Sequence, residues 1–144
     1  MKGLKQIIAL GQPCYLSLEW ALFYHGVSDQ PVIKIQCATL KDSFEMEVDT
    51  LRAEFVRIPE DCFFGYEMTE DRYLLEQLPL ATPEKALLDY LYRQRDEGYS
   101  PFLLFLIDWD RLNKQKLREY ADRMEPWLWP DLLQFLPDNF LLTS

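Results

Sequence analysis

The strongest constraint on the fold of this chain is the run Ala81-Thr82-Pro83-Glu84-Lys85-Ala86-Leu87-Leu88-Asp89. Thr82 suits the N-cap of a helix, where its hydroxyl accepts a hydrogen bond from a backbone N–H that has no partner within the helix. Pro83 suits the first helical position because its missing N–H is not needed there, and Glu84 follows where the helix dipole favours negative charge. The run therefore predicts a helix over residues 83–95.

The side-chain pattern of this helix predicts which residues face inward. Apolar residues recur at helical spacing, and we expect Ala86, Leu87, Tyr90 and Leu91 to pack against the core. Lys85 and Asp89 lie one turn apart, and we expect them to form an ion pair on the surface, worth a few tenths of a kcal/mol.

A second helix is predicted upstream. Ser17 suits its N-cap, the helix continues to about His25, and Gly26 ends it in a left-handed conformation. Its residues are apolar on nearly every side, which predicts a buried helix.

Short segments rich in β-branched and aromatic residues predict strands between the two helices. Pro31 precedes a strand at residues 32–37, and residues 44–48 alternate between apolar residues and glutamates, so we expect these two strands to form a hairpin. A further strand at residues 54–58 ends at Pro59, and residues 63–68 with 73–75 form the last predicted pair. The expected fold is α+β, with a mainly antiparallel sheet of four or five strands packed by helices.

The C-terminal third is predicted to be helical, over about residues 102–137. The apolar run at residues 102–107 fits a helix or a strand, Asp110 begins an amphipathic helix that reaches about Met124, and a short helix covers residues 131–136. No repeat or linker divides the chain, so residues 1–144 are predicted to form a single domain.

Composition narrows the class of protein. Hydrophobic residues make up 49% of the chain, which predicts a folded protein, and no stretch reaches the roughly 20 apolar residues that span a bilayer. The start lacks the features of a signal peptide, so a cytoplasmic location is expected. The cysteines are odd in number and have no metal-type spacing, which predicts buried free thiols: Cys14, Cys37 and Cys62.

The residue types needed for catalysis are mostly missing. His25 is the only histidine, and the five glycines form no phosphate-binding loop, so neither a metal site nor a cofactor is expected. A metal-dependent nuclease stays an alternative because carboxylates are plentiful, although no glutamate is followed two residues later by lysine, as the usual nuclease signature requires.

Blocks spread along the chain carry a resemblance to a known family. The run continues as A-T-P-E-K-A-L-L-D-Y-L-Y over residues 81–92, and an upstream block reads Y-L-S-L-E-W-A-L-F-Y-H-G over residues 15–26. Between them lie the blocks Pro31–Ala38, Phe55–Pro59 and Cys62–Gly65. In this order and spacing, the blocks resemble the toxin-neutralising region of the abortive-infection type IV antitoxins, the AbiEi family, over roughly residues 12–97.

The resemblance implies an interaction protein of a toxin–antitoxin system that opposes a nucleotidyltransferase-like toxin and catalyses no reaction. Members of the family also act as transcriptional regulators of their own operon through an N-terminal winged helix-turn-helix. Only Met1–Leu10 precede the first block here, too few residues for such a DNA-binding domain. The chain is then either a member without this domain or part of a longer protein.

Charged residues supply the candidate partner surface. Residues 44–100 carry six basic and fourteen acidic groups, which favours a basic partner over a phosphate backbone. Arg111, Lys114 and Arg118 form a basic stripe on the predicted helix, so a nucleic-acid-binding regulatory domain is a second alternative. The candidate residues for binding a partner are Glu84, Lys85, Asp89, Arg93, Arg111, Lys114 and Arg118.

Overall fold

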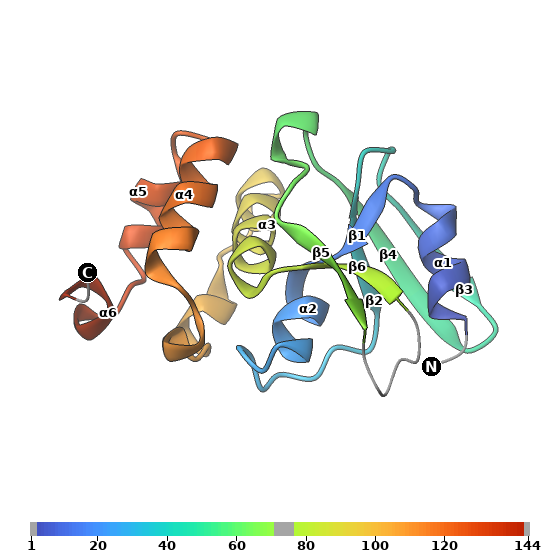
Figure 1. The fold of residues 1–144 in the computed structure, drawn as a ribbon, viewed down its shortest axis with the longest axis horizontal. Coiled ribbons are helices and arrows are strands. Elements are labelled where there is room, and N and C mark those ends of the chain that lie inside the picture. Colours follow the sequence, from blue (N-terminus) through green and yellow to red (C-terminus); the bar gives the residue numbers. More distant parts are fainter. Residues whose placement is uncertain (1–2, 71–76, 143–144) are drawn as a thin grey trace.

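A computed structural model describes residues 3–70 and 77–142 of the chain as an α+β fold built on one mixed sheet (Figure 1). The described strands number six, in the order β3-β4-β2-β1-β6-β5. Their bounds are β1 Cys14–Leu16, β2 Ile35–Thr39, β3 Phe44–Val48, β4 Leu51–Arg57, β5 Tyr66–Glu70 and β6 Gln77–Ala81. The α-helices are α1 Leu4–Leu10, α2 Leu18–Tyr24, α3 Pro83–Asp96, α4 Lys114–Met124, α5 Leu128–Leu133 and α6 Asp138–Leu142.

The sheet corrects the predicted number and pairing of strands. Neighbours β2 and β4 run parallel, as do β1 and β6, while the other three pairs are antiparallel. The predicted hairpin between β2 and β3 is wrong, because β4 lies between them. Only two residues join β3 to β4, and the first, Asp49, adopts a left-handed φ of 55°, which aspartate tolerates in a tight hairpin turn. Of the predicted last pair, residues 73–75 lie outside the described residues.

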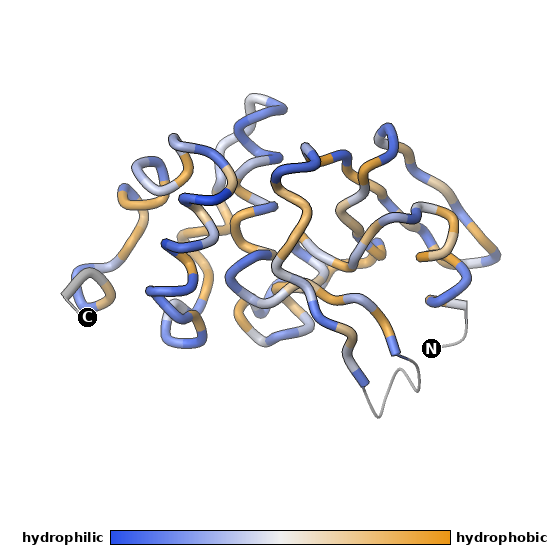
Figure 2. The backbone as a smooth tube through the Cα atoms, turned by 45° about the horizontal axis from the view of Figure 1, so that its top comes forward, coloured by the Kyte–Doolittle hydropathy of each residue, from blue (hydrophilic) through white to orange (hydrophobic). Residues whose placement is uncertain are grey.

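Helices cover both faces of the sheet. Neighbouring residues of a strand point to opposite faces, and β1 illustrates this: the Cys14 thiol donates to the Ile8 carbonyl of α1, whereas the Tyr15 hydroxyl reaches Asp89 of α3. Helices α2 and α3 pack on the second face, and α4 and α5 form a further layer beyond α3, on the left in Figure 1. Hydrophobic and hydrophilic segments alternate along these C-terminal helices in Figure 2, as expected of helices with one buried face.

Helix α3 begins as the sequence predicts. The Thr82 hydroxyl accepts a hydrogen bond from the Lys85 backbone N–H, and Pro83 occupies the first helical position. The predicted inward residues are buried, but so are their neighbours, and every residue from 84 to 91 is buried. The helix lies between α2 and the sheet on one side and α4 and α5 on the other, so its first two turns have no solvent-facing side.

Helix α2 is less buried than its composition predicts. Leu18, Ala21 and Leu22 are buried, but Phe23 is 44% exposed, and Trp20 and Tyr24 stack on each other at its partly open side. Ser17 is the N-cap residue, yet its side chain makes no capping hydrogen bond; its hydroxyl donates to Asp89.

The C-terminal third is helical, with different bounds from those predicted. Residues 102–105 form a 3-10 helix, as do Trp109–Arg111, and α4 begins only at Lys114. Asn113 causes this late start: its side chain accepts from the Lys116 N–H as a helix cap, and the preceding Leu112 is extended. A short helix near residues 131–136 corresponds to α5, and α6 was not predicted.

All three cysteines are buried and free, as predicted. Over residues 3–70 and 77–142, no helix has the length and apolar character needed to cross a membrane.

Candidate functional site: a buried polar cluster and a charged cleft

Four polar side chains form a fully buried cluster between β1, α2 and α3. The Lys85 ammonium donates to one oxygen of the Asp89 carboxylate and, at 2.8 Å, to the Tyr15 hydroxyl oxygen. The other carboxylate oxygen accepts from the hydroxyls of Tyr15 at 2.8 Å and Ser17 at 2.7 Å. We call Tyr15, Ser17, Lys85 and Asp89 the buried cluster; each has 0% exposure.

Aromatic rings complete the surroundings of the lysine. The Lys85 nitrogen lies 5.0 Å from the centre of the Phe64 ring, within the range of cation–π attraction, while the Tyr15 ring meets the ammonium through its hydroxyl group. Burial raises the pKa of Tyr15 well above its ordinary value, and the negative charge of Asp89 raises it further. The Tyr15 hydroxyl therefore stays protonated and acts as a hydrogen-bond donor to Asp89.

The predicted ion pair between Lys85 and Asp89 forms, but its predicted place on the surface is wrong. Lys85 and Asp89 do pair at i,i+4, but within the protein and not in solvent. A buried charge is costly unless it is paired and hydrogen-bonded, and both conditions are met here. Since neither side chain is accessible, the two residues cannot touch a partner in this conformation.

Glu84, another candidate partner residue, is 5% exposed and has a structural contact. Its carboxylate accepts from the Asn113 backbone N–H at 2.9 Å, immediately before α4. Glu84 therefore links the start of α3 to the start of α4, and its side chain is also unavailable to a partner.

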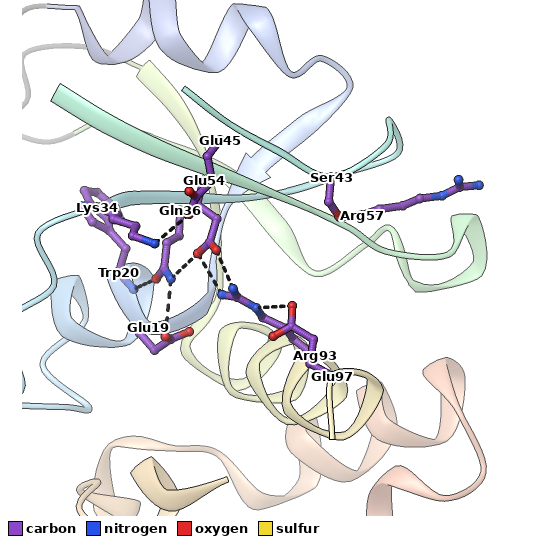
Figure 3. A network of polar contacts seen from close by, with 10 residues as sticks. All are labelled: Glu19, Trp20, Lys34, Gln36, Ser43, Glu45, Glu54, Arg57, Arg93 and Glu97. Carbon is purple, nitrogen blue, oxygen red and sulfur yellow. Dashed lines mark hydrogen bonds and ion pairs between the residues drawn. The ribbon is translucent and has the colours of Figure 1, made fainter. Parts of the chain in front are cut away.

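Arg93 lies in a second, partly open polar network, shown in Figure 3. Its guanidinium binds both carboxylate oxygens of Glu54 and, through Nε at 3.3 Å, the carboxylate of Glu97. Gln36 donates to the same Glu54 at 3.0 Å and accepts from the Trp20 backbone N–H at 2.9 Å. Burial raises the pKa of Glu54, but the hydrogen bonds from Arg93 and Gln36 outweigh this and bring the pKa below its ordinary value.

Replacing Arg93 with lysine is expected to lower the free energy of unfolding by about 1–2 kcal/mol, because an ammonium cannot reproduce the two parallel hydrogen bonds to Glu54. Chemical denaturation measures the change. Arg57→Lys is the matched control: its pair with Asp42 is exposed, so no measurable change is expected. Equal effects of the two replacements would contradict the structural role of the Arg93–Glu54 pair.

This network lines a cleft of about 560 Å³ between α2, the loop before β2, β4 and α3. Its charged lining consists of Glu19, Glu54, Glu97, Lys34, Arg52 and Arg93. Of the seven candidate partner residues, only Arg93 lies in this cleft, with a side chain 16% exposed.

The three basic candidates of the C-terminal third do not form one helical stripe. Arg111 precedes α4, is 60% exposed at its side chain and lies near the Asp108 carboxylate, at 3.5 Å. Lys114 is the first residue of α4, and Arg118 is exposed on the same helix with its guanidinium over the Trp129 ring. The break at Leu112 and Asn113 separates Arg111 from the other two.

His25, the only histidine of the chain, has a structural contact beside the family-like run. Its Nε2 lies 2.7 Å from the Ala81 carbonyl oxygen, so Nε2 carries the donated hydrogen. Burial lowers the pKa of His25 below its ordinary 6.5, although the bond to Ala81 and the negative charges of Glu84 and Glu67 oppose this.

The lowered pKa predicts a loss of stability in mild acid. Between the unfolded pKa near 6.5 and the lower folded pKa, the unfolded chain binds more protons, so stability falls as the pH drops through this window. We expect the denaturation midpoint to fall between pH 7 and pH 5.5, and His25→Gln to reduce this fall. An identical pH dependence in His25→Gln would show that His25 is not the group responsible for the loss of stability in acid.

The polar partners Tyr15, Ser17, Gln36 and Glu54 were not recognised as site residues from sequence. Tyr15 and Ser17 alternate within one block, and this alternation was the available signal, since a polar residue in a buried segment needs a polar partner. Across the part of the chain that the structure describes, no three His, Cys, Asp or Glu residues lie close enough to hold a metal ion.

Comparison of the chain with protein-family models, with curated proteins and with solved structures found no match.

Proposed function

We propose that this chain is an antitoxin-type interaction protein of a type IV, abortive-infection toxin–antitoxin system, which opposes a nucleotidyltransferase-like toxin. The proposal rests on the resemblance of its sequence blocks to the AbiEi family. In this proposal the chain acts by binding and not by catalysis, and the buried cluster is part of its scaffold.

One structural observation supports the proposal more than any other. The two longest family-like blocks, residues 15–26 and 81–92, each contribute polar side chains to the buried cluster, and the contacts join residues 70 or more positions apart. A chance match of two short motifs gives no reason for their polar residues to meet. The convergence is expected if both blocks belong to one structural unit.

The buried cluster leaves other residues to contact a partner. On the C-terminal side, Arg111 and Arg118 are exposed. Elsewhere, seven carboxylates between residues 44 and 70 are exposed on three separate segments: Glu45, Glu47 and Asp49 at β3 and its turn, Glu60 and Asp61 in a 3-10 helix beside α4, and Glu67 and Glu70 on β5. Negative charge on any of these segments favours a basic partner by steering its approach.

Growth rescue tests the proposal. The chain is co-expressed with a nucleotidyltransferase-like protein encoded beside its gene, and an inactive form of that protein serves as the control for toxicity. We expect the chain to restore growth. If the chain is folded, the toxin is active and growth is not restored, the proposal is wrong.

Charge reversals then identify the contacting surface. Arg111→Glu with Arg118→Glu alters the C-terminal side, and Glu45→Lys with Glu47→Lys alters the acidic edge at β3. Because all four residues are exposed, neither pair should unfold the chain. The proposal predicts that one pair reduces rescue strongly and the other does not.

A nucleic-acid-binding regulatory domain is the second candidate function, and one observation favours it. Two cations of α4 lie over aromatic rings, Arg118 over Trp129 and Lys116 over Tyr120, and basic and aromatic groups together suit single-stranded nucleic acid. This function predicts binding that weakens steeply with added salt and is lost in Arg118→Glu.

A further inference from the structure

Three phenylalanine rings form a connected apolar surface where the 3-10 helix at residues 102–105 meets the end of α5. Phe102 is 64% exposed and Phe105 is 66% exposed, and their ring centres lie 6.3 Å apart. Phe105 also contacts Phe135, which follows α5, with ring centres 5.3 Å apart. Leu106 and Leu133, close to these rings in the chain, are exposed as well. We call these five residues the aromatic patch, and exposed apolar side chains grouped in this way mark interaction sites.

The backbone that carries the patch is fixed on both sides of the exposed rings. Before them, the Ser100 carbonyl accepts from the Gln94 side chain of α3 at 3.0 Å. After them, the Asp108 backbone N–H donates to the Val27 carbonyl at 2.8 Å. Between them, Leu104 is 1% exposed and anchors the 3-10 helix in the core. The two exposed phenylalanines are therefore held in place, and a pre-organised surface loses less entropy when it binds a partner.

The segments that carry the patch are acidic. Residues 96–110 contain four carboxylates and no lysine or arginine, and residues 131–142 contain two carboxylates and again no lysine or arginine. Four cations lie beside these six acids, and they are Arg93 near Glu97, Arg95 near Asp131, Arg111 near Asp108, and Lys114, which lines a hollow with Asp110. Six acids against four cations leave an excess of negative charge, and the whole chain carries a net charge of -9.

This charge decides which occupant fits the patch. The phosphate groups of nucleic acids and anionic lipids are repelled by an acidic surface. A second copy of the chain is disfavoured too, because a twofold contact pairs identical surfaces and brings another net charge of -9 against the first. A protein segment with lysine or arginine beside apolar side chains complements both the charge and the apolar area.

We propose that the aromatic patch docks a basic amphipathic segment of another protein. The apolar side chains of that segment cover Phe102, Phe105 and Phe135, and its lysine or arginine side chains face the acidic segments on either side. Phe105 is the centre of the surface because its ring contacts both other rings. The inference concerns the chemistry of a partner and not its identity, so it does not depend on the antitoxin proposal.

Three model peptides test the charge and the apolar requirement on the intact chain. The first contains only lysine and leucine, with leucines at i, i+3, i+4 and i+7, so that its helix has one apolar face. The second has glutamate in place of lysine, and the third has the composition of the first in a scrambled order without an apolar face. Fluorescence anisotropy of the labelled peptides measures binding. We expect the first peptide to bind about tenfold more tightly than either of the others.

Serine variants locate the binding. Phe102→Ser with Phe105→Ser removes most of the exposed aromatic area, and we expect binding of the first peptide to weaken by about tenfold. Ile33→Ser is the matched control: Ile33 is 91% exposed but lies outside the patch, so binding should be unchanged. Denaturation curves check that the variants fold. On the wild-type chain, the backbone amide NMR signals of residues 102–106 should shift when the first peptide is added, which locates the site without any replacement.

Equal binding of the first and second peptides would overturn the proposal, and so would equal binding of the first and the scrambled peptide. Equal binding by the wild type and the double serine variant, or NMR shifts confined to other segments, would also overturn it. The other occupants give different results. A wild-type dimer in sedimentation that the double variant loses would assign the patch to a second copy. Binding to phosphatidylcholine vesicles that the double variant loses would assign it to lipid. Growth rescue measures another property, so the two proposals fail separately.

Discussion

Replacing Asp89 with alanine is expected to lower the free energy of unfolding by about 3–5 kcal/mol. The replacement leaves the Lys85 ammonium fully buried with no carboxylate beside it, and it removes the acceptor of the Tyr15 and Ser17 hydroxyls. Urea denaturation measures the change as a lower midpoint with an unchanged slope.

Asp96→Ala is the matched control for this measurement. Asp96 is the last residue of the same helix and is exposed, so its replacement should change stability by no more than about 0.5 kcal/mol. A loss below about 1 kcal/mol for Asp89→Ala would show that the buried cluster does not hold α3 against β1.

Replacing Gly65 with alanine is expected to lower the free energy of unfolding by about 2–4 kcal/mol, for two reasons that add. Gly65 has a left-handed φ of 80°, which costs any other residue energy, and an added Cβ would lie 2.8 Å from Cγ of Lys85. That lysine cannot move aside, because its ammonium is bound to Tyr15 and Asp89.

Gly98→Ala separates these two reasons. Gly98 has nearly the same φ, 77°, but no atom within 4 Å of an added Cβ. We expect a loss of about 1 kcal/mol there, from the backbone conformation alone. If the two variants lost the same stability, close packing of Gly65 against Lys85 would contribute nothing.

Local chemistry was enough to predict single elements of the fold. Thr82, Pro83 and Glu84 define the start of α3 through hydrogen bonds and charges within one turn. The same reasoning failed for α4, because the apolar spacing from Asp110 suggested an early start while the capping side chain belongs to Asn113. Asn113 is also held by Glu84, a contact from another helix that local patterns do not contain.

Strand pairing could not be predicted from the sequence pattern. Residues 44–48 are expected to alternate as a half-buried strand, and this is confirmed for half-buried Phe44 and Met46 and exposed Glu45 and Glu47, but Val48 is 37% exposed. The strand that pairs with β3 is β4, which also pairs with β2 in parallel. No tight turn connects β2 to β4, so the sequence near either strand does not reveal this pairing.

In the buried cluster, too, the local contact could be predicted and the contacts with distant segments could not. Spacing at i,i+4 predicted that Lys85 and Asp89 would pair, since this is a property of any helix. Their burial depends on the packing of α3 against β1 and the start of α2, and their hydroxyl partners come from a segment about 70 residues away. The pair was therefore predicted, but not its surroundings.

The central claim is that the family-like motif builds a scaffold and that the chain acts through other, exposed residues. The most direct test is growth rescue by a variant in which the whole buried cluster is apolar: Tyr15→Phe, Ser17→Ala, Lys85→Met and Asp89→Leu. Replacing every member leaves no unpaired charge, and buried ion pairs exchanged for apolar residues often keep their stability. The account predicts that this variant folds and rescues growth as well as the wild-type chain. Loss of rescue by the folded variant, with rescue intact in the wild type, would contradict it and assign the activity to the buried cluster itself.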